Sequence, residues 1–178
     1  VEGKDLAGSM LVSNHVSWID IYAINSWYPP RFVAKSEIRS WPVIGWLCAQ
    51  TGVLFVERAR KRDAHRIMHA IADAMRAGDA ICVFPEGTTS DGLQLLPFHA
   101  NLFQAPVSAG APIRPVALRY RIAATGELTT IPAYIGDLSM MDTINAILNG
   151  PPLVVEVFVG PAVAPEMDRR ALAAHSQE

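Results

Sequence analysis

The chain has 178 residues, enough to bury one hydrophobic core, and no internal repeat or low-complexity stretch divides it. Hydrophobic residues make up 51% of the chain and charged residues 18%, which is apolar for a soluble domain and suits a protein that works beside lipid. The formal net charge of −2 gives no general basic field, so nucleic acid is not an expected partner.

The cysteines, the hydropathy and the start of the chain add three expectations. Cys48 and Cys82 stand alone without metal-ligand spacing, so we expect buried thiols and no disulfide. No apolar run reaches the ~20 residues of a membrane-spanning helix. Because the chain opens at Val1 and meets a strand within a few residues, we expect a single domain over residues 1–178 that lacks an N-terminal membrane-associating segment.

Short apolar runs alternate with stretches of helical periodicity along the chain. In chain order they predict a strand at 10–13, a helix at 18–26, a strand at 32–34, a helix at 41–50, a strand at 53–56, a helix at 63–77, a strand at 80–84, a helix at 102–109, a strand at 113–120, a helix at 139–148 and a strand at 153–159. We expect an α/β fold, with a mostly parallel or mixed central sheet flanked by helices. Residues beyond 121 carry no usable motif, and His175 is expected in a frayed polar tail.

A histidine and an aspartate directly follow the first predicted strand, in the run NHVSWID. The imidazole of His15 can take a proton from a hydroxyl, and a carboxylate on its other nitrogen fixes the tautomer and stabilises the cation. Ser17 is the expected N-cap of the next helix, which would place Asp20 in the first turn. Taken alone, this spacing also fits an ordinary histidine at a strand end.

Four sequence blocks follow one another between about Val12 and Tyr120. They are NHVSWID, the segment from Arg31 to Arg58 that contains RFVAKSEIRSWPVIGWL and GVLFVER, FPEGTTSDG at 84–92, and APIRPVALRY at 111–120. In this order they resemble the motifs of the glycerolipid acyltransferases, the family of 1-acylglycerol-3-phosphate acyltransferase.

The resemblance implies an O-acyltransferase of phospholipid biosynthesis. It would move a fatty acyl group from acyl-CoA or acyl carrier protein to the hydroxyl of a lyso-glycerolipid, most simply 1-acylglycerol-3-phosphate, at the cytoplasmic face of the cell membrane. His15 would be the general base and Asp20 its orienting partner. The acceptor supplies the nucleophile, which fits the absence of a Gly-x-Ser-x-Gly elbow. No metal or prosthetic cofactor is implied.

The same resemblance assigns acceptor binding to six residues: Lys35, Arg58, Glu86, Gly87, Thr88 and Thr89. Arginine offers a phosphate a planar fork and lysine a point charge. Backbone N–H groups of the turn at 86–88 could hold an oxyanion, although Gly87 also fits a tight turn. Family members that use a phosphate acceptor typically have arginine at the position of Thr89. This departure makes lyso-ornithine lipid or another lysolipid a competing acceptor.

A tryptophan-rich apolar cluster lies in the second block, formed by Trp41, Val43, Ile44, Trp46 and Leu47. It predicts either an acyl-chain groove or membrane-facing surface, or else ordinary core. His65, His69 and Asp73 share one helix face at metal-ligand spacing, but the arginines beside them argue against a cation.

Two other classes of protein remain possible from the sequence. A thioesterase or lipase could use the same histidine and aspartate with water as the acceptor. A non-catalytic lipid-binding domain would not need an intact His15–Asp20 pair. Acyl transfer measured with and without added lysolipid distinguishes the three.

Overall fold

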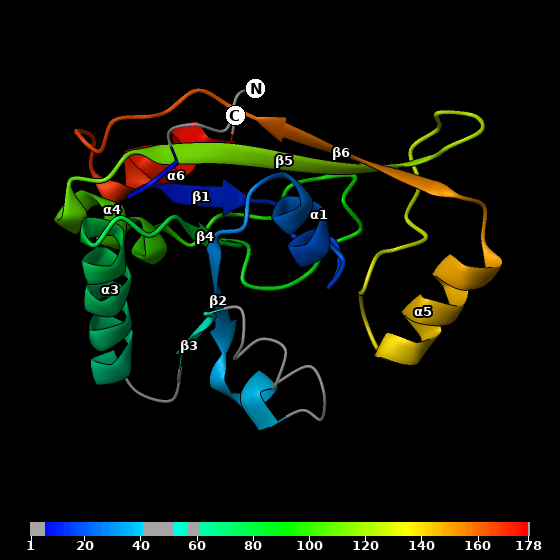
Figure 1. The fold of residues 1–178 in the computed structure, drawn as a ribbon, viewed down its shortest axis with the longest axis horizontal. Helices are drawn as coiled ribbons and strands as arrows, with labels where there is room; N and C mark the ends of the chain where they lie inside the picture. The colour runs from blue at the N-terminus through cyan, green and yellow to red at the C-terminus, as the bar shows by residue number, and fades with distance from the viewer. Residues whose placement is uncertain (1–5, 41–51, 57–60, 178) are drawn as a thin grey trace.

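The structure of the chain, a computed structural model, describes residues 6–40, 52–56 and 61–177. Within these ranges the strands are β1 (Met10–Ser13), β2 (Arg31–Lys35), β3 (Leu54–Val56), β4 (Ile81–Val83), β5 (Ile113–Ile122) and β6 (Leu153–Val159). They form a six-stranded sheet in the order β3-β2-β4-β1-β5-β6 (Figure 1). All neighbouring pairs are parallel except β5–β6, which is antiparallel. The predicted α/β class with a mixed sheet is confirmed.

Helices cover both faces of this sheet. The described helices are α1 (Asp20–Trp27), α3 (Lys61–Arg76), α4 (Gln104–Ala109), α5 (Met140–Asn149) and α6 (Arg169–Gln177), with 3-10 turns at Ser36–Ser40 and Ala100–Phe103. Side chains of β1 alternate between the faces. Met10 and Val12 join one core cluster with residues of α3 and α6, whereas Leu11 joins another with Ala23 and Ile24 of α1.

The six predicted strands are all present, and two predicted helix starts need correction. Ser17 does not cap α1: the helix begins at Asp20, and its N-cap position is Ile19. The reason is that the Asp20 carboxylate accepts the Ser17 backbone N–H, so residues before Asp20 form a turn instead of helix. The helix predicted to start at residue 63 starts at Lys61 instead, because Lys61 and Arg62 are both good helix formers.

The C-terminal segment is a packed helix, and the predicted frayed tail is wrong. Leu172 and Ala173 of α6 are buried in the same core cluster as Met10. Asp168 precedes the helix and its Oδ1 accepts the backbone N–H groups of Arg170 and Ala171 at 2.7 and 3.1 Å. These bonds lower the pKa of Asp168. An aspartate directly before a helix is a common N-terminal cap, and the sequence contains this signal here.

Three further observations concern the expectations from composition. None of the described helices is long and apolar enough to cross a membrane. Cys82 is buried in β4, where burial and the nearby Asp20 raise its thiol pKa. Cys48 and the predicted helix at 41–50 lie outside the described residues.

Candidate active site

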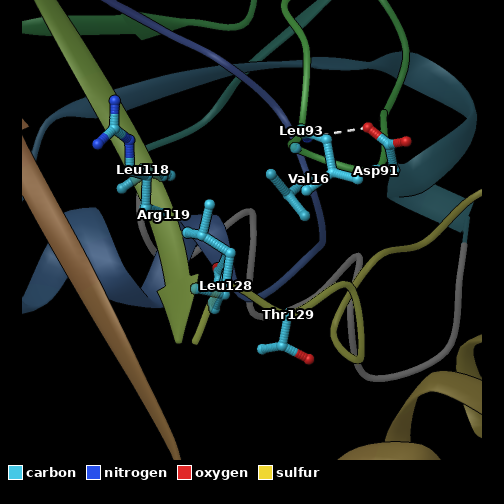
Figure 2. A pocket seen from close by; sticks show the side chains of 9 residues that line it. Val16, Asp91, Leu93, Leu118, Arg119, Leu128 and Thr129 are labelled. Atoms are coloured by element: carbon cyan, nitrogen blue, oxygen red, sulfur yellow. Dashed lines mark hydrogen bonds between the residues drawn. The ribbon is translucent and has the colours of Figure 1, made fainter. Parts of the chain in front are cut away.

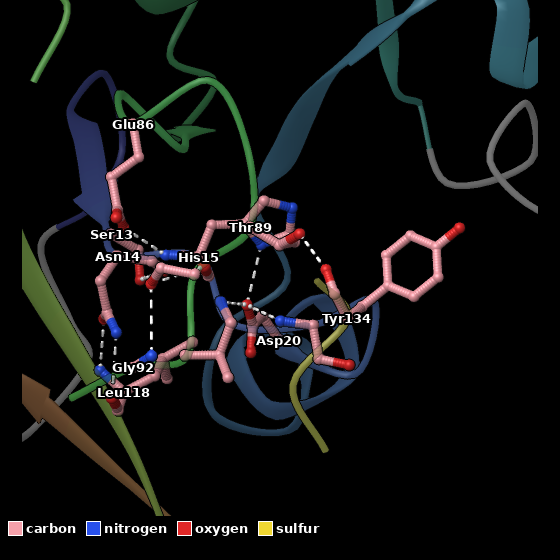
Figure 3. Close-up of polar contacts among 12 residues, drawn as sticks. Ser13, Asn14, His15, Asp20, Glu86, Thr89, Gly92, Leu118 and Tyr134 are labelled. Carbon is pink, nitrogen blue, oxygen red and sulfur yellow. Dashed lines mark hydrogen bonds and ion pairs between the residues drawn. The ribbon is translucent and has the colours of Figure 1, made fainter. Parts of the chain in front are cut away.

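The site is built at the carboxyl ends of two neighbouring parallel strands. β1 and β4 are parallel neighbours, with Met10 beside Ile81 and Val12 beside Val83. The segments that follow the two strands therefore leave the sheet at the same end, the carboxyl end of the strands. The backbone N–H of His15, just past β1, donates to Glu86 Oε1, just past β4, at 2.7 Å (Figure 3). The first and third sequence blocks, about seventy residues apart in sequence, therefore meet directly.

Asn14 explains why β1 ends where it does. Its buried side-chain amide donates to the Leu118 carbonyl at 3.1 Å and accepts the Leu118 backbone N–H at 2.7 Å. A side chain thus takes the hydrogen bonds that a continuing strand would have made with β5. β1 therefore ends at Ser13, and the chain has left the sheet at His15.

His15 and Asp20 form a hydrogen-bonded pair. His15 Nδ1 lies 2.8 Å from Asp20 Oδ2, and the Asp20 side chain is completely buried, whereas that of His15 is 21% exposed. The same Oδ2 accepts the backbone N–H groups of Val16 and Ser17 at 2.7 and 2.9 Å (Figure 3). Because the carboxylate accepts at Nδ1, the nitrogen of His15 that remains to take a proton is Nε2.

Two aromatic residues that sequence reasoning missed contact this pair. The Tyr120 hydroxyl donates to Asp20 Oδ1 at 2.6 Å. The Phe84 ring stacks on the His15 imidazole, with centroids 4.0 Å apart and planes 15° from parallel. Both residues lie in the matched blocks, but nothing in their local sequence indicates a contact with a residue some seventy to a hundred positions away. Phe84 fixes the plane of the imidazole, and Tyr120 fixes the carboxylate.

The third block lies against the pair, and several of its polar groups are already engaged. Glu86 is 4% exposed, and its second oxygen, Oε2, accepts the Leu96 backbone N–H at 3.0 Å. The Gly87 backbone N–H donates to the Phe84 carbonyl, and Gly87 has a φ of +72°, which favours glycine. The Thr89 hydroxyl donates to the Tyr134 backbone carbonyl (Figure 3). Thr88 is exposed.

The remaining predicted site residues are only partly described. Lys35 is the last residue of β2 and pairs with Val56 of β3, so it lies at the carboxyl end of the parallel strands, as His15 does. The side chain of Lys35 lies outside the described part of the structure. Arg58 and the cluster Trp41, Ile44, Trp46 and Leu47 lie outside it altogether.

The end of the third block closes over the His15 segment. Ser90 donates its backbone N–H to the His15 carbonyl at 2.8 Å. Gly92 approaches so closely that an added Cβ would lie 2.8 Å from Val16 Cγ2. The pocket here, lined by Val16, Gly92 and Tyr120 among others, encloses only about 10 Å³ (Figure 2). This is the space of about one water, so it cannot hold an acyl chain.

Metal-ligand side chains do not gather here. Among residues 6–40, 52–56 and 61–177, no group of three or more His, Cys, Asp or Glu side chains is arranged to hold a metal ion. Asp73, from the predicted histidine-aspartate face of α3, pairs instead with Arg76 at 2.8 Å.

Residues 4–119 match the family model described as Acyltransferase. The chain belongs to this acyltransferase family. Over 164 residues it is 41% identical to the 1-acyl-sn-glycerol-3-phosphate acyltransferase of Neisseria gonorrhoeae, with 92% of this chain covered and 64% of the relative. Over 177 residues it is 38% identical to the lyso-ornithine lipid O-acyltransferase of Brucella abortus, covering 92% of this chain and 66% of the relative. The chain thus spans about two thirds of the length of these relatives.

The fold of this acyltransferase domain is shared with a solved structure. The 1-acyl-sn-glycerophosphate (LPA) acyltransferase PlsC of Thermotoga maritima superposes with a TM-score of 0.62 at 22% sequence identity. The match covers 98% of this chain and 64% of PlsC. The fold of the chain is therefore a known architecture.

Proposed function

We propose that the protein is an O-acyltransferase that moves a fatty acyl group from a thioester donor, acyl-CoA or acyl carrier protein, to the hydroxyl of a lysolipid. The observation that carries this proposal is the His15–Asp20 pair: a partly exposed imidazole whose Nδ1 faces a fully buried carboxylate 2.8 Å away. Membership of the acyltransferase family supports the same reaction class. No cofactor is required, because the thioester supplies the activated acyl group.

In the proposed reaction, His15 Nε2 takes the proton of the acceptor hydroxyl while that oxygen attacks the thioester carbonyl carbon. The carbon–sulfur bond of the resulting tetrahedral intermediate then breaks, and the imidazolium returns the proton to the departing thiolate. Asp20 stabilises the imidazolium between these two proton transfers. The products are the acylated lipid and the free thiol, and His15 ends in its starting state.

For the acceptor we propose 1-acylglycerol-3-phosphate. Relatives named 1-acyl-sn-glycerol-3-phosphate acyltransferase are 41% identical to this chain. The phosphate would be bound by Lys35 and Arg58. Lys35 is the last residue of β2, at the carboxyl end of the parallel strands, and Arg58 follows β3 by two residues in the sequence. We propose accordingly that the protein acts in phospholipid biosynthesis, at the cytoplasmic face of the membrane.

Lyso-ornithine lipid is the second candidate acceptor. It is favoured by Thr89, which stands where a phosphate-binding arginine is typical of the family, and whose hydroxyl is engaged by the Tyr134 carbonyl. Relatives named lyso-ornithine lipid O-acyltransferase are 34% and 38% identical to the chain.

A lysolipid panel with a radiolabelled acyl donor tests the proposal on the full-length protein. We expect acyl transfer that depends on added lysolipid, is highest with 1-acylglycerol-3-phosphate, and falls at least ~10²-fold in a folded His15→Ala variant. Thioester cleavage at the same rate without lysolipid would instead indicate a hydrolase. Binding of lysolipid without any turnover would indicate a lipid-binding domain.

A further inference from the structure

The Asp20 carboxylate is held on two sides, and the two sides come from different parts of the chain. Oδ2 faces His15 Nδ1 and the backbone N–H groups of Val16 and Ser17, all within the same short segment. Oδ1 accepts the hydroxyl of Tyr120, which comes from β5, at 2.6 Å. Tyr120 is 5% exposed and Asp20 is 0% exposed, so water does not readily replace this bond.

A carboxylate bonded through one oxygen only can rotate about its terminal torsion, which is broad for aspartate. Rotation would weaken the contact between Oδ2 and His15 Nδ1. The second bond, through Oδ1, fixes the carboxylate plane. Burial and the Asp20 charge raise the pKa of Tyr120, so the phenol keeps its proton and stays a donor.

We propose that Tyr120 is a positioning residue for the His15–Asp20 pair: its hydroxyl locks the Asp20 carboxylate in the orientation that keeps the proton of neutral His15 on Nδ1 and leaves Nε2 free to act as the base. The catalytic consequence rests on the proposed acyl transfer. The effect on the histidine tautomer does not depend on it.

The first test measures the tautomer. Long-range ¹H–¹⁵N correlation through the carbon-bound ring protons, on full-length protein labelled with ¹⁵N-histidine, reports which nitrogen carries the proton; the His15 signals are assigned by their loss in His15→Ala. We expect wild-type His15 to be protonated on Nδ1 and Tyr120→Phe to show a mixture with the Nε2 form. Tyr22→Phe is the matched control, because Tyr22 is a 53% exposed tyrosine on α1, the helix that carries Asp20.

The second test is a double-mutant cycle on acyl transfer. Tyr120→Phe should lower kcat about tenfold or more and leave both KM values unchanged, because one charge-assisted hydrogen bond to the carboxylate is lost and no substrate contact is. In an Asp20→Asn background, where no carboxylate remains to be oriented, adding Tyr120→Phe should change kcat less than twofold. Adding Tyr22→Phe should leave kcat unchanged in each of the two backgrounds.

The outcomes separate the inference from the proposed function. An unchanged tautomer in a folded Tyr120→Phe protein, or equal losses in the wild-type and Asp20→Asn backgrounds, overturns the inference. A changed tautomer in a protein that transfers acyl groups to no lysolipid supports the inference and overturns the proposed function instead.

Discussion

At the scale of single residues, the carboxylates of the site have different tasks. Asp20 faces the imidazole, whereas Glu86 binds only backbone: its two oxygens accept the N–H groups of His15 and Leu96. The family resemblance predicts that Glu86 is an acceptor-binding residue. Through these two hydrogen bonds, the Glu86 carboxylate also joins the His15 segment to the loop after β4.

Glu86→Gln distinguishes the two roles. An amide has one accepting oxygen, so one of the two backbone bonds is lost and His15 is held less firmly. We expect kcat to fall about tenfold, as for one lost bond to a charged group, with little change in the acceptor KM. Asp91→Asn is the control on the same loop, since Asp91 accepts the Leu93 N–H at 2.9 Å and can still do so as an amide. A raised acceptor KM with normal kcat would return Glu86 to acceptor binding.

Thr89→Arg tests the acceptor at the position where the chain departs from its family. A guanidinium adds a bidentate phosphate contact, so the ratio of kcat/KM for 1-acylglycerol-3-phosphate over lyso-ornithine lipid should rise about tenfold. The change also removes the hydroxyl bond to the Tyr134 carbonyl. Thr89→Gln, long but uncharged, controls for that loss. Equal effects of Arg and Gln on both acceptors would show that residue 89 only completes the turn.

At the scale of elements, the loop after β4 is the part that must fit closely. The first part of the loop contacts the His15 segment through Glu86. The loop contacts the same segment again through Ser90 and Gly92. Phe84, the residue that directly follows β4, also stacks on the His15 imidazole. A displacement of this loop therefore moves the imidazole, even though most of the loop does not touch it.

Gly92→Ala is expected to damage both stability and activity. Gly92 has a φ of +76°, and the new methyl would lie 2.8 Å from Val16 Cγ2. Gly126→Ala is a matched control, because Gly126 has a φ of +72° but no atom within 4 Å of an added Cβ. We expect similar backbone strain in both, about 1 kcal/mol, and a further loss of stability with at least tenfold lower kcat only in Gly92→Ala. Thermal melts and kinetics check this; identical behaviour of the two variants would contradict it.

At the scale of the whole molecule, the two ends of the described chain share one core. Leu172 of α6 is completely buried and packs in the cluster that contains Met10 and Val12 of β1, the strand that leads to His15. The C-terminal helix therefore supports the sheet beneath the candidate site. By contrast, Leu148 of α5 is 76% exposed, and Figure 1 shows α5 well apart from α3, α4 and α6.

Leu172→Ala should lower the free energy of unfolding by about 2–5 kcal/mol, the usual cost of a leucine-sized cavity in a core. Leu148→Ala, the same change at an exposed position, should cost less than about 0.5 kcal/mol. Urea unfolding of the two variants measures the difference. Equal stabilities would mean that α6 is not part of the folding core.

The sequence by itself determined the strands, the α/β class and the His15–Asp20 pair. These depend on local periodicity and on short, ordered motifs, which are contained in neighbouring residues. The prediction for the C-terminal segment was wrong. Leu172 and Ala173 form only a short apolar stripe in a mostly polar segment, and a helix this short is stabilised by packing against the rest of the core.

Only the tertiary structure decided how the pair is held. Tyr120 reaches Asp20 across a hundred residues, Phe84 stacks on His15, and Glu86 binds backbone. None of these contacts has a sequence signature, because each depends on parallel strands β4, β1 and β5 lying side by side. The sheet order is set by burial of the two core clusters as a whole, so partners distant in sequence become neighbours only once the chain has folded.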